Sequence, residues 1–359
     1  MKITQITVSE IHIPLRTPFK TALRTVSDVH DVIVRVLTDP GAVGWGEAPP
    51  TAVITGETIG SIRAAVEEYI APAIQGMEID DLDGIMHRMD RSILKNTSAK
   101  AAVDMAVYDL YARSCGKPLY KVLGGARSVL ETDLTISLNP KEEMVRDALE
   151  GVSRGFRILK IKTGKGDLAD VECLKAIRQA VGPEIVLRVD ANQGWNARQA
   201  VRLIRKMEDE GVAPELVEQP VPAHDFEGLK MVTANVDTPI LADESVFGAG
   251  DAIRILQERA ADLLNIKLMK TGGIYQALKI CDVAEIYGVE CMIGCMLESK
   301  LAVSAAAHLA AGRSVITRLD LDGPSLCSMD PYTGGPEYEG PWIRMNEAAG
   351  IGIRGCVAL

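Results

Sequence analysis

The sequence has few aromatic residues, an odd number of cysteines and no long apolar run, and each shortage excludes a class of protein. Phe, Trp and Tyr make up 4% of the 359 residues, so the core must be built mainly from aliphatic side chains. The seven cysteines form no Cys-x-x-Cys pair and match no zinc-binding spacing, which favours a reduced, cytoplasmic protein. No run of about 18 apolar residues occurs, which argues against a membrane span. The first residues alternate between polar and apolar, so no signal peptide is expected.

Basic residues are outnumbered by acidic ones. The chain has 39 Lys and Arg against 49 Asp and Glu, a formal net charge of −10. A chain this acidic lacks the basic surface to which nucleic acid or an anionic membrane binds, so neither partner is expected. Hydrophobic residues at 47% and charged residues at 25% indicate a globular protein rather than a disordered one. The length suits one large or two ordinary domains.

The first third of the chain mixes strand and helix patterns. Residues 2–13 alternate with a period of two and predict a strand, and a hairpin around an Asp-Pro-Gly turn follows. Two helices are expected next, over residues 58–74 and 98–115, with Thr58 and Ser98 as N-caps. Strands followed by helices predict a separate α+β unit.

Beyond the Gly-Gly pair that ends this unit, β-branched runs alternate regularly with helical patterns. Right-handed crossovers return each parallel strand to one sheet, so eight such units predict a closed (β/α) barrel. An open, doubly wound sheet is the alternative, and it requires the strand order to reverse. No Gly-x-Gly-x-x-Gly follows the first strand, so no dinucleotide site is expected. The expected strands are residues 132–138, 158–163, 185–190, 216–220, 240–243, 263–268, 291–296 and 317–322.

Three carboxylates stand at the ends of successive strands. Asp190, Glu218 and Asp243 lie at the ends of the third, fourth and fifth expected strands. The carboxyl ends of barrel strands meet at one mouth, where three uncompensated carboxylates repel one another. A hard divalent cation relieves that repulsion, and oxygen ligands favour Mg²⁺ or Mn²⁺. The alternative is three independent surface acids.

Lysines from two strands complete the pattern. Lys160 and Lys162 are two residues apart, so both side chains point to the same face of their strand, expected to be the barrel interior. Lys267 lies four strands further round, on the other side of the barrel axis. Two lysines in this arrangement reach opposite faces of one carbon atom, and burial beside cations lowers the pKa of such a lysine toward neutrality. Lys270 is expected to face solvent, and Glu298 is assigned no role.

This pattern resembles the muconate lactonising subgroup of the enolase superfamily and, within it, the dipeptide epimerases. The resemblance implies a modified TIM barrel, (β/α)7β, with an N-terminal α+β capping domain. The implied domains are residues 1–124 for the cap, 125–322 for the barrel and 323–359 for a segment that packs back on the cap. The motifs that carry the resemblance are residues 19–25, 44–48, 190–195 and 266–270 and the Asp-Leu-Asp sequence at 320–322.

The resemblance also implies an activity, a magnesium-dependent 1,1-proton transfer at the α-carbon of the C-terminal residue of a dipeptide. The interconversion of L-Ala-D-Glu and L-Ala-L-Glu in murein peptide recycling is the implied reaction. One Mg²⁺ per subunit, with Mn²⁺ as an alternative, and a homo-oligomer are implied. The implied metal ligands are Asp190, Glu218 and Asp243, and the implied catalysts are Lys162 and Lys267. The implied substrate-binding residues are Arg24, Ile54, Thr135, Lys160, Cys295, Leu297, Asp320 and Asp322.

Two pairs among these substrate-binding residues carry the implied specificity for the substrate. Asp320 and Asp322 hold the α-ammonium group of a dipeptide in this family. Arg24, in the capping loop, suits a bidentate pair with a side-chain carboxylate, and together with Ile54 it indicates glutamate at the epimerised position.

Other functions stay open. An epimerase of apolar or cationic dipeptides uses the same scaffold, as does a lyase such as an o-succinylbenzoate synthase or an acid-sugar dehydratase. A non-catalytic binding protein is a further alternative. The five histidines show no metal-ligand spacing in the sequence, and we expect all of them to be structural or exposed.

Overall fold

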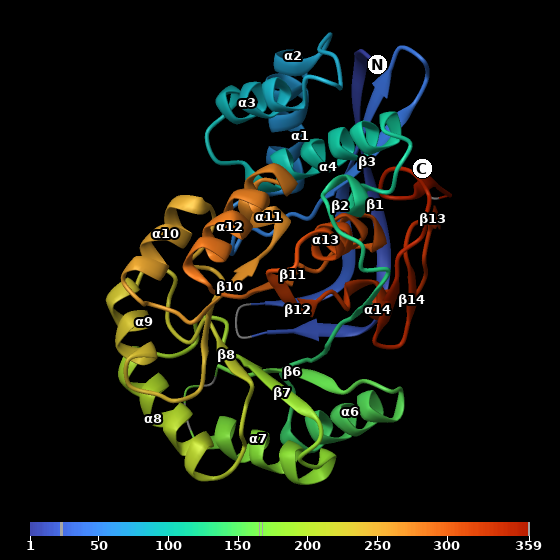
Figure 1. The fold of residues 1–359 in the computed structure, drawn as a ribbon. Coiled ribbons are helices and arrows are strands. Elements are labelled where there is room, and N and C mark those ends of the chain that lie inside the picture. The colour runs from blue at the N-terminus through green and yellow to red at the C-terminus, as the bar shows by residue number, and fades with distance from the viewer. Residues whose placement is uncertain (22–23, 165, 167, 358–359) are drawn as a thin grey trace.

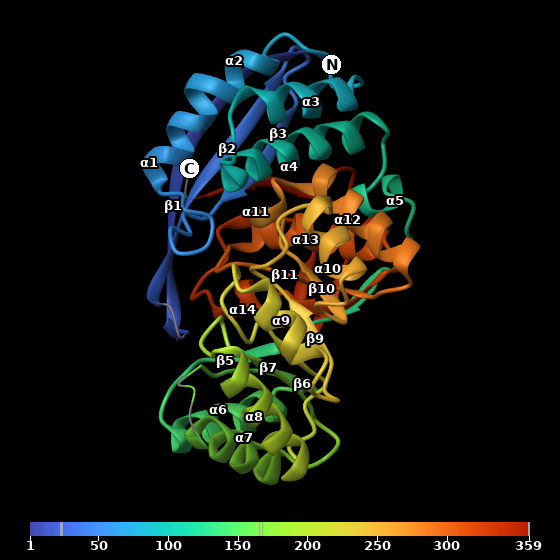
Figure 2. The same ribbon diagram turned by 90° about the vertical axis from the view of Figure 1, so that its left-hand side faces the viewer.

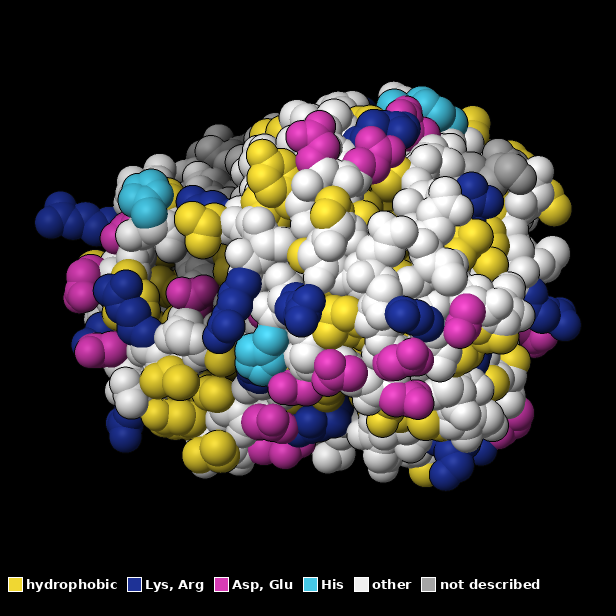
Figure 3. Space-filling view, turned by 90° about the horizontal axis from the view of Figure 1, so that it is seen from above, with side chains coloured by type: hydrophobic (Ala, Val, Ile, Leu, Met, Phe, Trp, Pro, Cys, Tyr) yellow, Lys and Arg dark blue, Asp and Glu magenta, His cyan; other side chains and the backbone are white. Residues whose placement is uncertain are grey.

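The computed structural model describes residues 1–21, 24–164, 166 and 168–357, and it divides into a cap and a barrel (Figures 1 and 2). The cap lies across one end of the barrel, and the C-terminal strands return to lie beside it. Within the described residues, no helix is both long and apolar enough to cross a membrane. Seen from above, the surface shows acidic and basic side chains interspersed (Figure 3).

The cap begins with a three-stranded antiparallel sheet in the order β1-β2-β3. These strands are β1 (Ile3–Lys20), β2 (Thr25–Thr38) and β3 (Val43–Ala48). The expected first strand is therefore correct, but it is longer than the alternating pattern suggests. The register of β1 and β2 shifts between Pro14 and Phe19, and the pair then continues to Lys20 opposite Thr25.

Helices cover one face of this sheet. Thr58 caps the first of them, as expected, with a reciprocal capping box to Ser61. Ser98 is not the N-cap of the long helix, because the Glu57 carboxylate accepts the backbone N–H groups of Ser98 and Ala99 in that place. The cap helices are α1 (Ile59–Ala64), a π-helical turn (Ala65–Ile70), α2 (Ala71–Ile74), α3 (Leu82–Ser92), α4 (Thr97–Ser114) and α5 (Leu119–Val122).

Two glycines let α4 pack directly on β3. A Cβ atom at Gly46 would lie 1.8 Å from the carbonyl oxygen of Ala102, and one at Gly44 would lie 2.1 Å from that of Ala106. Only glycine permits so close an approach of strand and helix. The other side of α4 contacts helices of the barrel, which explains why almost the whole helix is buried.

The barrel is the predicted one. Eight parallel strands follow one another around the sheet in chain order, with helices between them. The strands are β5 (Leu134–Ile136), β6 (Ile158–Lys162), β7 (Val186–Asp190), β8 (Leu216–Glu218), β9 (Ile240–Ala242), β10 (Leu263–Ile266), β11 (Cys291–Gly294) and β12 (Ile316–Asp320). The helices are α6 (Lys141–Ser153), α7 (Leu168–Val181), α8 (Ala197–Asp209), α9 (Phe226–Thr233), α10 (Ala249–Gln257), α11 (Leu268–Thr271), α12 (Ile274–Tyr287) and α13 (Lys300–Gly312). The strand order does not reverse, which excludes the doubly wound alternative.

The last segment joins the two parts of the molecule. It contains α14 (Gly323–Leu326), β13 (Tyr332–Gly334), β14 (Glu337–Glu339), β15 (Trp342–Arg344) and β16 (Ile353–Cys356). β15 pairs with β4 (Val129–Glu131), and Leu15 of the cap forms a bridge with Cys327. Glu47 at the end of β3 also accepts hydrogen bonds from Ser299 and from the first turn of α13. The cap is therefore fixed to the barrel mouth, although the domain boundaries at 124 and 322 stay a prediction.

Candidate active site

Lys160 and Lys162 lie on β6 with their side chains inside the barrel. Both are buried, and Lys162 Nζ lies 2.6 Å from Asp190 Oδ2 on the neighbouring strand. Lys160 Nζ contacts three carboxylates, with distances of 3.1 Å to Asp190, 2.7 Å to Glu218 and 2.7 Å to Asp320. Both ammonium groups therefore lie on the face of the strand that their spacing of two residues predicts.

The structure brings together the carboxylates predicted to bind a metal. Asp190 pairs in register with Glu218 on β8, and Asp243 directly follows β9. All three are at most 1% exposed. Burial favours the neutral form of each, but Lys162 and Lys160 outweigh burial at Asp190 and lower its pKa to about 2.

Glu218 lies among other buried carboxylates, and its pKa reflects their negative charge. Its pKa rises to about 7, first because of burial and next because of the Asp190 carboxylate. Asn265 on β10 donates a 2.8 Å hydrogen bond to Glu218 Oε1, so the side chain is held in place in spite of the repulsion. Lys160 and Lys267 lower this pKa but do not outweigh burial and the repulsion between the carboxylates.

Two lysines hold Asp243, and one of them, Lys270, does not face solvent as expected. Lys267 Nζ lies 2.8 Å from Asp243 Oδ2, and Lys270 Nζ lies 2.6 Å from Asp243 Oδ1. Lys270 was expected to face solvent, but it is completely buried and also donates to the carbonyl oxygen of Asn265. The strand stops at Ile266 and the chain turns into the short helix α11, which directs Lys270 inward.

The pKa of Lys267 also differs from the expectation. Burial lowers this pKa, but the Asp243 carboxylate and further acids outweigh burial, and the net pKa lies above the usual range of a lysine. The carboxylates that raise it are those predicted to bind a cation. A divalent ion on those carboxylates opposes this effect, because it neutralises the charge that holds the proton on Lys267.

On the other side of the mouth lie the two acids of the Asp-Leu-Asp motif. Asp322 Oδ2 accepts the backbone N–H of Thr135 at 2.7 Å, which aims this carboxylate at the end of β5. Asp320 Oδ2 pairs with Lys160. The pKa of Asp322 is raised to about 6 by burial and by the charge of Asp320. This acid pair therefore forms a second negative site at the mouth.

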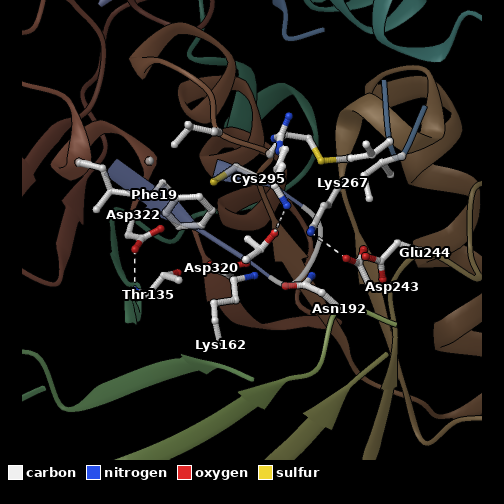
Figure 4. A pocket seen from close by; sticks show the side chains of 18 residues that line it. Phe19, Thr135, Lys162, Asn192, Asp243, Glu244, Lys267, Cys295, Asp320 and Asp322 are labelled. Carbon is white, nitrogen blue, oxygen red and sulfur yellow. Dashed lines mark hydrogen bonds and ion pairs between the residues drawn. The ribbon is translucent and has the colours of Figure 1, made fainter. Parts of the chain in front are cut away.

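One pocket, with a free volume of about 60 Å³, connects these groups. Figure 4 shows Lys162 and Lys267 entering from different elements toward the same space, with Asp243 and Glu244 on one side and Thr135 and Asp322 on the other. Lys160, Asp190 and Glu218 are not among the residues that line the pocket. Lys160 contacts Asp320 and Asp190 contacts Lys162, both of which line it, and Glu218 contacts Lys160. The predicted residues that line it are Arg24, Ile54, Thr135, Lys162, Asp243, Lys267, Cys295, Leu297, Asp320 and Asp322.

The cap supplies one wall of this pocket. The arm of β1 docks on the barrel, where Lys20 Nζ donates to Asn139 Oδ1 at 2.8 Å and the backbone N–H of Leu138 donates to the carbonyl of Lys20. Arg24 lies just beyond this contact and lines the pocket together with Ile54. Residues 22 and 23 of the predicted capping loop lie outside the described residues.

The donor set fits a hard divalent cation. Asp190, Glu218 and Asp243 offer only oxygen atoms, and they lie on consecutive strands of the barrel. In the part of the chain that the structure describes, no hydrogen-bond donor reaches Glu244 Oε2 or Asn192 Oδ1, and both side chains are buried. Oxygen-only donors, crowded charge and unpaired oxygen atoms favour Mg²⁺ or Mn²⁺ over a softer metal.

Several pocket residues were not selected from the sequence. Asn192 donates its backbone N–H to Asp190 Oδ1 at 2.9 Å from a left-handed conformation, with φ 43°. Glu244 has a pKa raised to about 8 by burial and by Asp243. The ring of Phe19 lies over the Lys162 ammonium group at 5.9 Å and limits its access to water. Asn192 and Glu244 follow strand ends directly, a signal that could have found them, whereas Phe19 reaches the pocket only through the docking of the cap.

The fold and the site define a class of protein, a capped (β/α)7β barrel enzyme with carboxylates and lysines at the carboxyl ends of its strands. Two family models match the chain. The model for the mandelate racemase / muconate lactonizing enzyme N-terminal domain matches residues 3–124, and the enolase C-terminal domain-like model matches residues 143–355. The chain therefore belongs to the mandelate racemase / muconate lactonizing enzyme family of the enolase superfamily, as the motifs predicted.

Known relatives are similar to this chain over its whole length. An L-Ala-D/L-Glu epimerase from Clostridium acetobutylicum is 53% identical over 355 residues, which cover 99% of both chains. The solved substrate complex of the L-Ala-D/L-Glu epimerase from Bacillus subtilis has 52% identity and a TM-score of 0.98, with 99% of each chain covered. A dipeptide epimerase from Enterococcus faecalis, solved with Mg and L-Leu-L-Tyr, has 44% identity and a TM-score of 0.96 over 99% of this chain and 100% of that one. The chain is an enzyme of the isomerase class, an epimerase.

Proposed function

We propose that this enzyme epimerises the C-terminal residue of dipeptides and acts on L-Ala-D-Glu and L-Ala-L-Glu. The observation that carries the proposal is the pair Lys162 and Lys267, which enter one pocket from different sides of the barrel. Epimerisation needs one group to remove the α-proton and another to return a proton on the opposite face. The relatives of known activity support the dipeptide as substrate.

Asp190, Glu218 and Asp243 are the proposed ligands of one Mg²⁺ per subunit. A bound cation supplies Lewis-acid stabilisation for negative charge on the substrate carboxylate. Two relatives of this fold were solved with Mg and a dipeptide, which supports the choice of metal. Lys160, already in contact with Asp190, Glu218 and Asp320, adds a fixed positive charge where the charge of the deprotonated substrate develops.

The two catalytic lysines exchange roles with the direction of the reaction. Lys162 removes or returns the α-proton on one face, and Lys267 does so on the other. Each Nζ lies less than 3 Å from a carboxylate, Asp190 or Asp243, which fixes the position of the ammonium group. Phe19 covers Lys162, so a proton held there is shielded from solvent.

Substrate recognition uses both sides of the mouth. Asp320 and Asp322 are proposed to bind the α-ammonium of the first residue, since two buried carboxylates there match one cation. Thr135, Cys295 and Leu297 line the path of the dipeptide. From the cap, Arg24 binds the side-chain carboxylate of glutamate, and Ile54 contacts its methylene groups.

A second candidate substrate class is apolar dipeptides. Phe19, Val53 and Met296 line the same pocket, and the Enterococcus relative was solved with L-Leu-L-Tyr. Arg24 argues for the acidic dipeptide, because its half-buried guanidinium group suits a charge-assisted pair with a substrate carboxylate. We further propose that the dipeptide comes from murein peptide recycling and that the enzyme acts in the cytoplasm. We also propose that it forms a homo-oligomer.

A dipeptide panel tests the proposal. The purified enzyme with Mg²⁺ is incubated with L-Ala-L-Glu, L-Leu-L-Tyr and a dipeptide with a C-terminal lysine, and the diastereomers are separated by chromatography. We expect a new diastereomer of L-Ala-L-Glu at the highest kcat/KM of the three. Preference for an apolar dipeptide would select the second candidate, and the absence of a new diastereomer from all three dipeptides would overturn both.

A further inference from the structure

Away from the residues that line the barrel pocket, histidine and acidic side chains gather on an exposed face of the β1–β2 pair. His12 and His30 are direct partners across these strands, and their rings stack with centroids 3.6 Å apart. Glu10 lies two residues before His12, so it shares the same face. His30 Nε2 lies 2.9 Å from Glu10 Oε2, and His12 Nδ1 lies 3.4 Å from Asp28 Oδ2.

We propose that Glu10, His12 and His30 bind a transition-metal ion of the Zn²⁺ type. One nitrogen from each ring and one carboxylate oxygen all lie within 4.8 Å of one another. Atoms that share one Zn²⁺ at about 2.0–2.2 Å are roughly 3–3.5 Å apart. The three side chains are near enough to share an ion once the stacked rings rotate so that a nitrogen of each points at it. The antiparallel register fixes the spacing of the two histidines, because cross-strand partners have neighbouring Cβ atoms.

The donor set separates this site from the one in the barrel. Two imidazole groups and one carboxylate suit Zn²⁺, Ni²⁺ or Cu²⁺, whereas the oxygen-only set at the barrel mouth suits Mg²⁺. All three side chains are at least one-third exposed, so an ion reaches them without any opening of the fold. The fourth position is open to water or to Asp28, whose carboxylate already contacts His12.

Arg63 supports the carboxylate rather than blocking it. Its guanidinium group binds Glu10 Oε1 at 2.8 Å, while the contact with His30 uses the other oxygen, Oε2. Hydrogen bonds from His30 and from Arg63 lower the pKa of Glu10, and the one from Arg63 can persist when His30 binds an ion. Arg63 therefore orients the ligand in the way that outer residues do at known metal sites.

A metal here would join two strands at the base of the arm that carries Arg24. The cluster lies next to the register shift between Pro14 and Phe19, beyond which β1 and β2 continue to the capping loop. His30 and Arg24 line the same surface recess of about 140 Å³. An ion that links β1 to β2 would therefore stabilise the hairpin that presents Arg24 to the substrate.

The test measures metal binding by protein without an affinity tag. The chain is stripped with a chelator, saturated with Mg²⁺ to fill the barrel site, and titrated with Zn²⁺ by calorimetry. His12→Gln and His30→Gln are the test variants. His87→Gln is the matched control, because His87 also faces a carboxylate, Asp83, but stacks on no second histidine.

We expect one Zn²⁺ site in the wild type and in His87→Gln, with affinity about tenfold or more weaker in either test variant. Co²⁺ in place of Zn²⁺ should give visible absorption bands that the test variants lose. Zn²⁺ should raise the melting temperature of the wild type but not of His12→Gln. Equal Zn²⁺ affinity and stoichiometry in all four proteins would overturn the proposal, and so would a wild type that binds no Zn²⁺ under these conditions. Circular dichroism of each variant without Zn²⁺ verifies that it is folded.

Discussion

At the scale of single residues, the site is a balance of buried charges. Asp190 and Asp243 keep their charge because lysines contact them, whereas Glu218 and Glu244 have raised pKa values because burial and neighbouring acids dominate. Removing one member of such a group leaves the others without compensation. Single substitutions in the pocket should therefore have large and specific effects.

Arg24→Ala should reduce activity on acidic dipeptides only. The charge-assisted pair between a guanidinium group and a carboxylate is worth about 1.5–3 kcal/mol, which corresponds to a loss of roughly 10- to 150-fold in kcat/KM for L-Ala-L-Glu. Activity on L-Leu-L-Tyr should change little. Arg16→Ala is the control, because Arg16 lies on β1, the strand that leads to the capping loop, but donates to the carbonyl oxygen of Cys327. An equal loss with both dipeptides would show that Arg24 does not select the substrate.

Lys270→Met should weaken metal binding although Lys270 is not among the residues that line the pocket. Its ammonium group holds Asp243 Oδ1, and loss of such an outer contact costs about 10- to 100-fold in metal affinity or activity. The Mg²⁺ concentration for half-maximal activity should rise accordingly. Lys279→Met, which removes a lysine stacked on Tyr275, is the control. An unchanged Mg²⁺ requirement in Lys270→Met would contradict the positioning role.

At the scale of elements, distant side chains hold the helix ends that join cap and barrel. Glu57 caps α4, and Glu47 caps α13 across the boundary between the two parts. His308, in the middle of α13, accepts the backbone N–H of Tyr120 in α5 at 3.1 Å. Each contact joins residues far apart in the sequence, so the helix patterns predicted the helices but not these contacts.

His308 should make stability depend on pH. Burial lowers its pKa to about 4 from the usual 6.5, so the unfolded chain binds a proton more readily than the folded one. Stability is therefore fully present above pH 6.5 and is lost as the pH falls toward 4, by up to about 3 kcal/mol. His308→Asn keeps a hydrogen-bond acceptor but cannot titrate. Urea unfolding between pH 4 and 8 should show a smaller pH dependence in the variant, and parallel curves would refute this account.

The sequence predicted the helices and strands better than the contacts between distant residues, because those contacts depend on how the elements pack. Asp190, Glu218 and Asp243 could be selected because parallel strands of regular spacing must present their ends at one mouth. The orientation expected for Lys270 is wrong because the strand ends at Ile266, two residues earlier than expected, and the chain then turns into α11. The pairing of His12 with His30 depends on an antiparallel register that no local pattern contains.

At the scale of the whole molecule, a barrel provides the chemistry and a cap closes its mouth. The face seen in Figure 3 mixes acidic and basic side chains, whereas the acids of the site gather in one pocket and directly beside it. A cation that binds there stabilises the folded state alone, because the unfolded chain does not assemble the three carboxylates.

Mg²⁺ should therefore raise the melting temperature. At a concentration one hundred times the dissociation constant, the expected stabilisation is about 2.7 kcal/mol, which corresponds to several degrees for a chain of this size. Asp190→Asn should lose most of this response, whereas His12→Gln should retain it. Scanning calorimetry with chelator and with Mg²⁺ measures the shift, and the same melting temperature in both would contradict a metal site at these carboxylates.

The central claim is that Lys162 and Lys267 act on opposite faces of one α-carbon. Its most direct measurement is the exchange of the α-proton in deuterated water, followed by NMR, for Lys162→Ala and Lys267→Ala with each diastereomer of L-Ala-Glu. The account predicts that neither variant epimerises, that one exchanges only the L-Glu dipeptide and that the other exchanges only the D-Glu dipeptide. A single-lysine variant that still interconverts the two diastereomers, or two variants that exchange the same diastereomer, would contradict it.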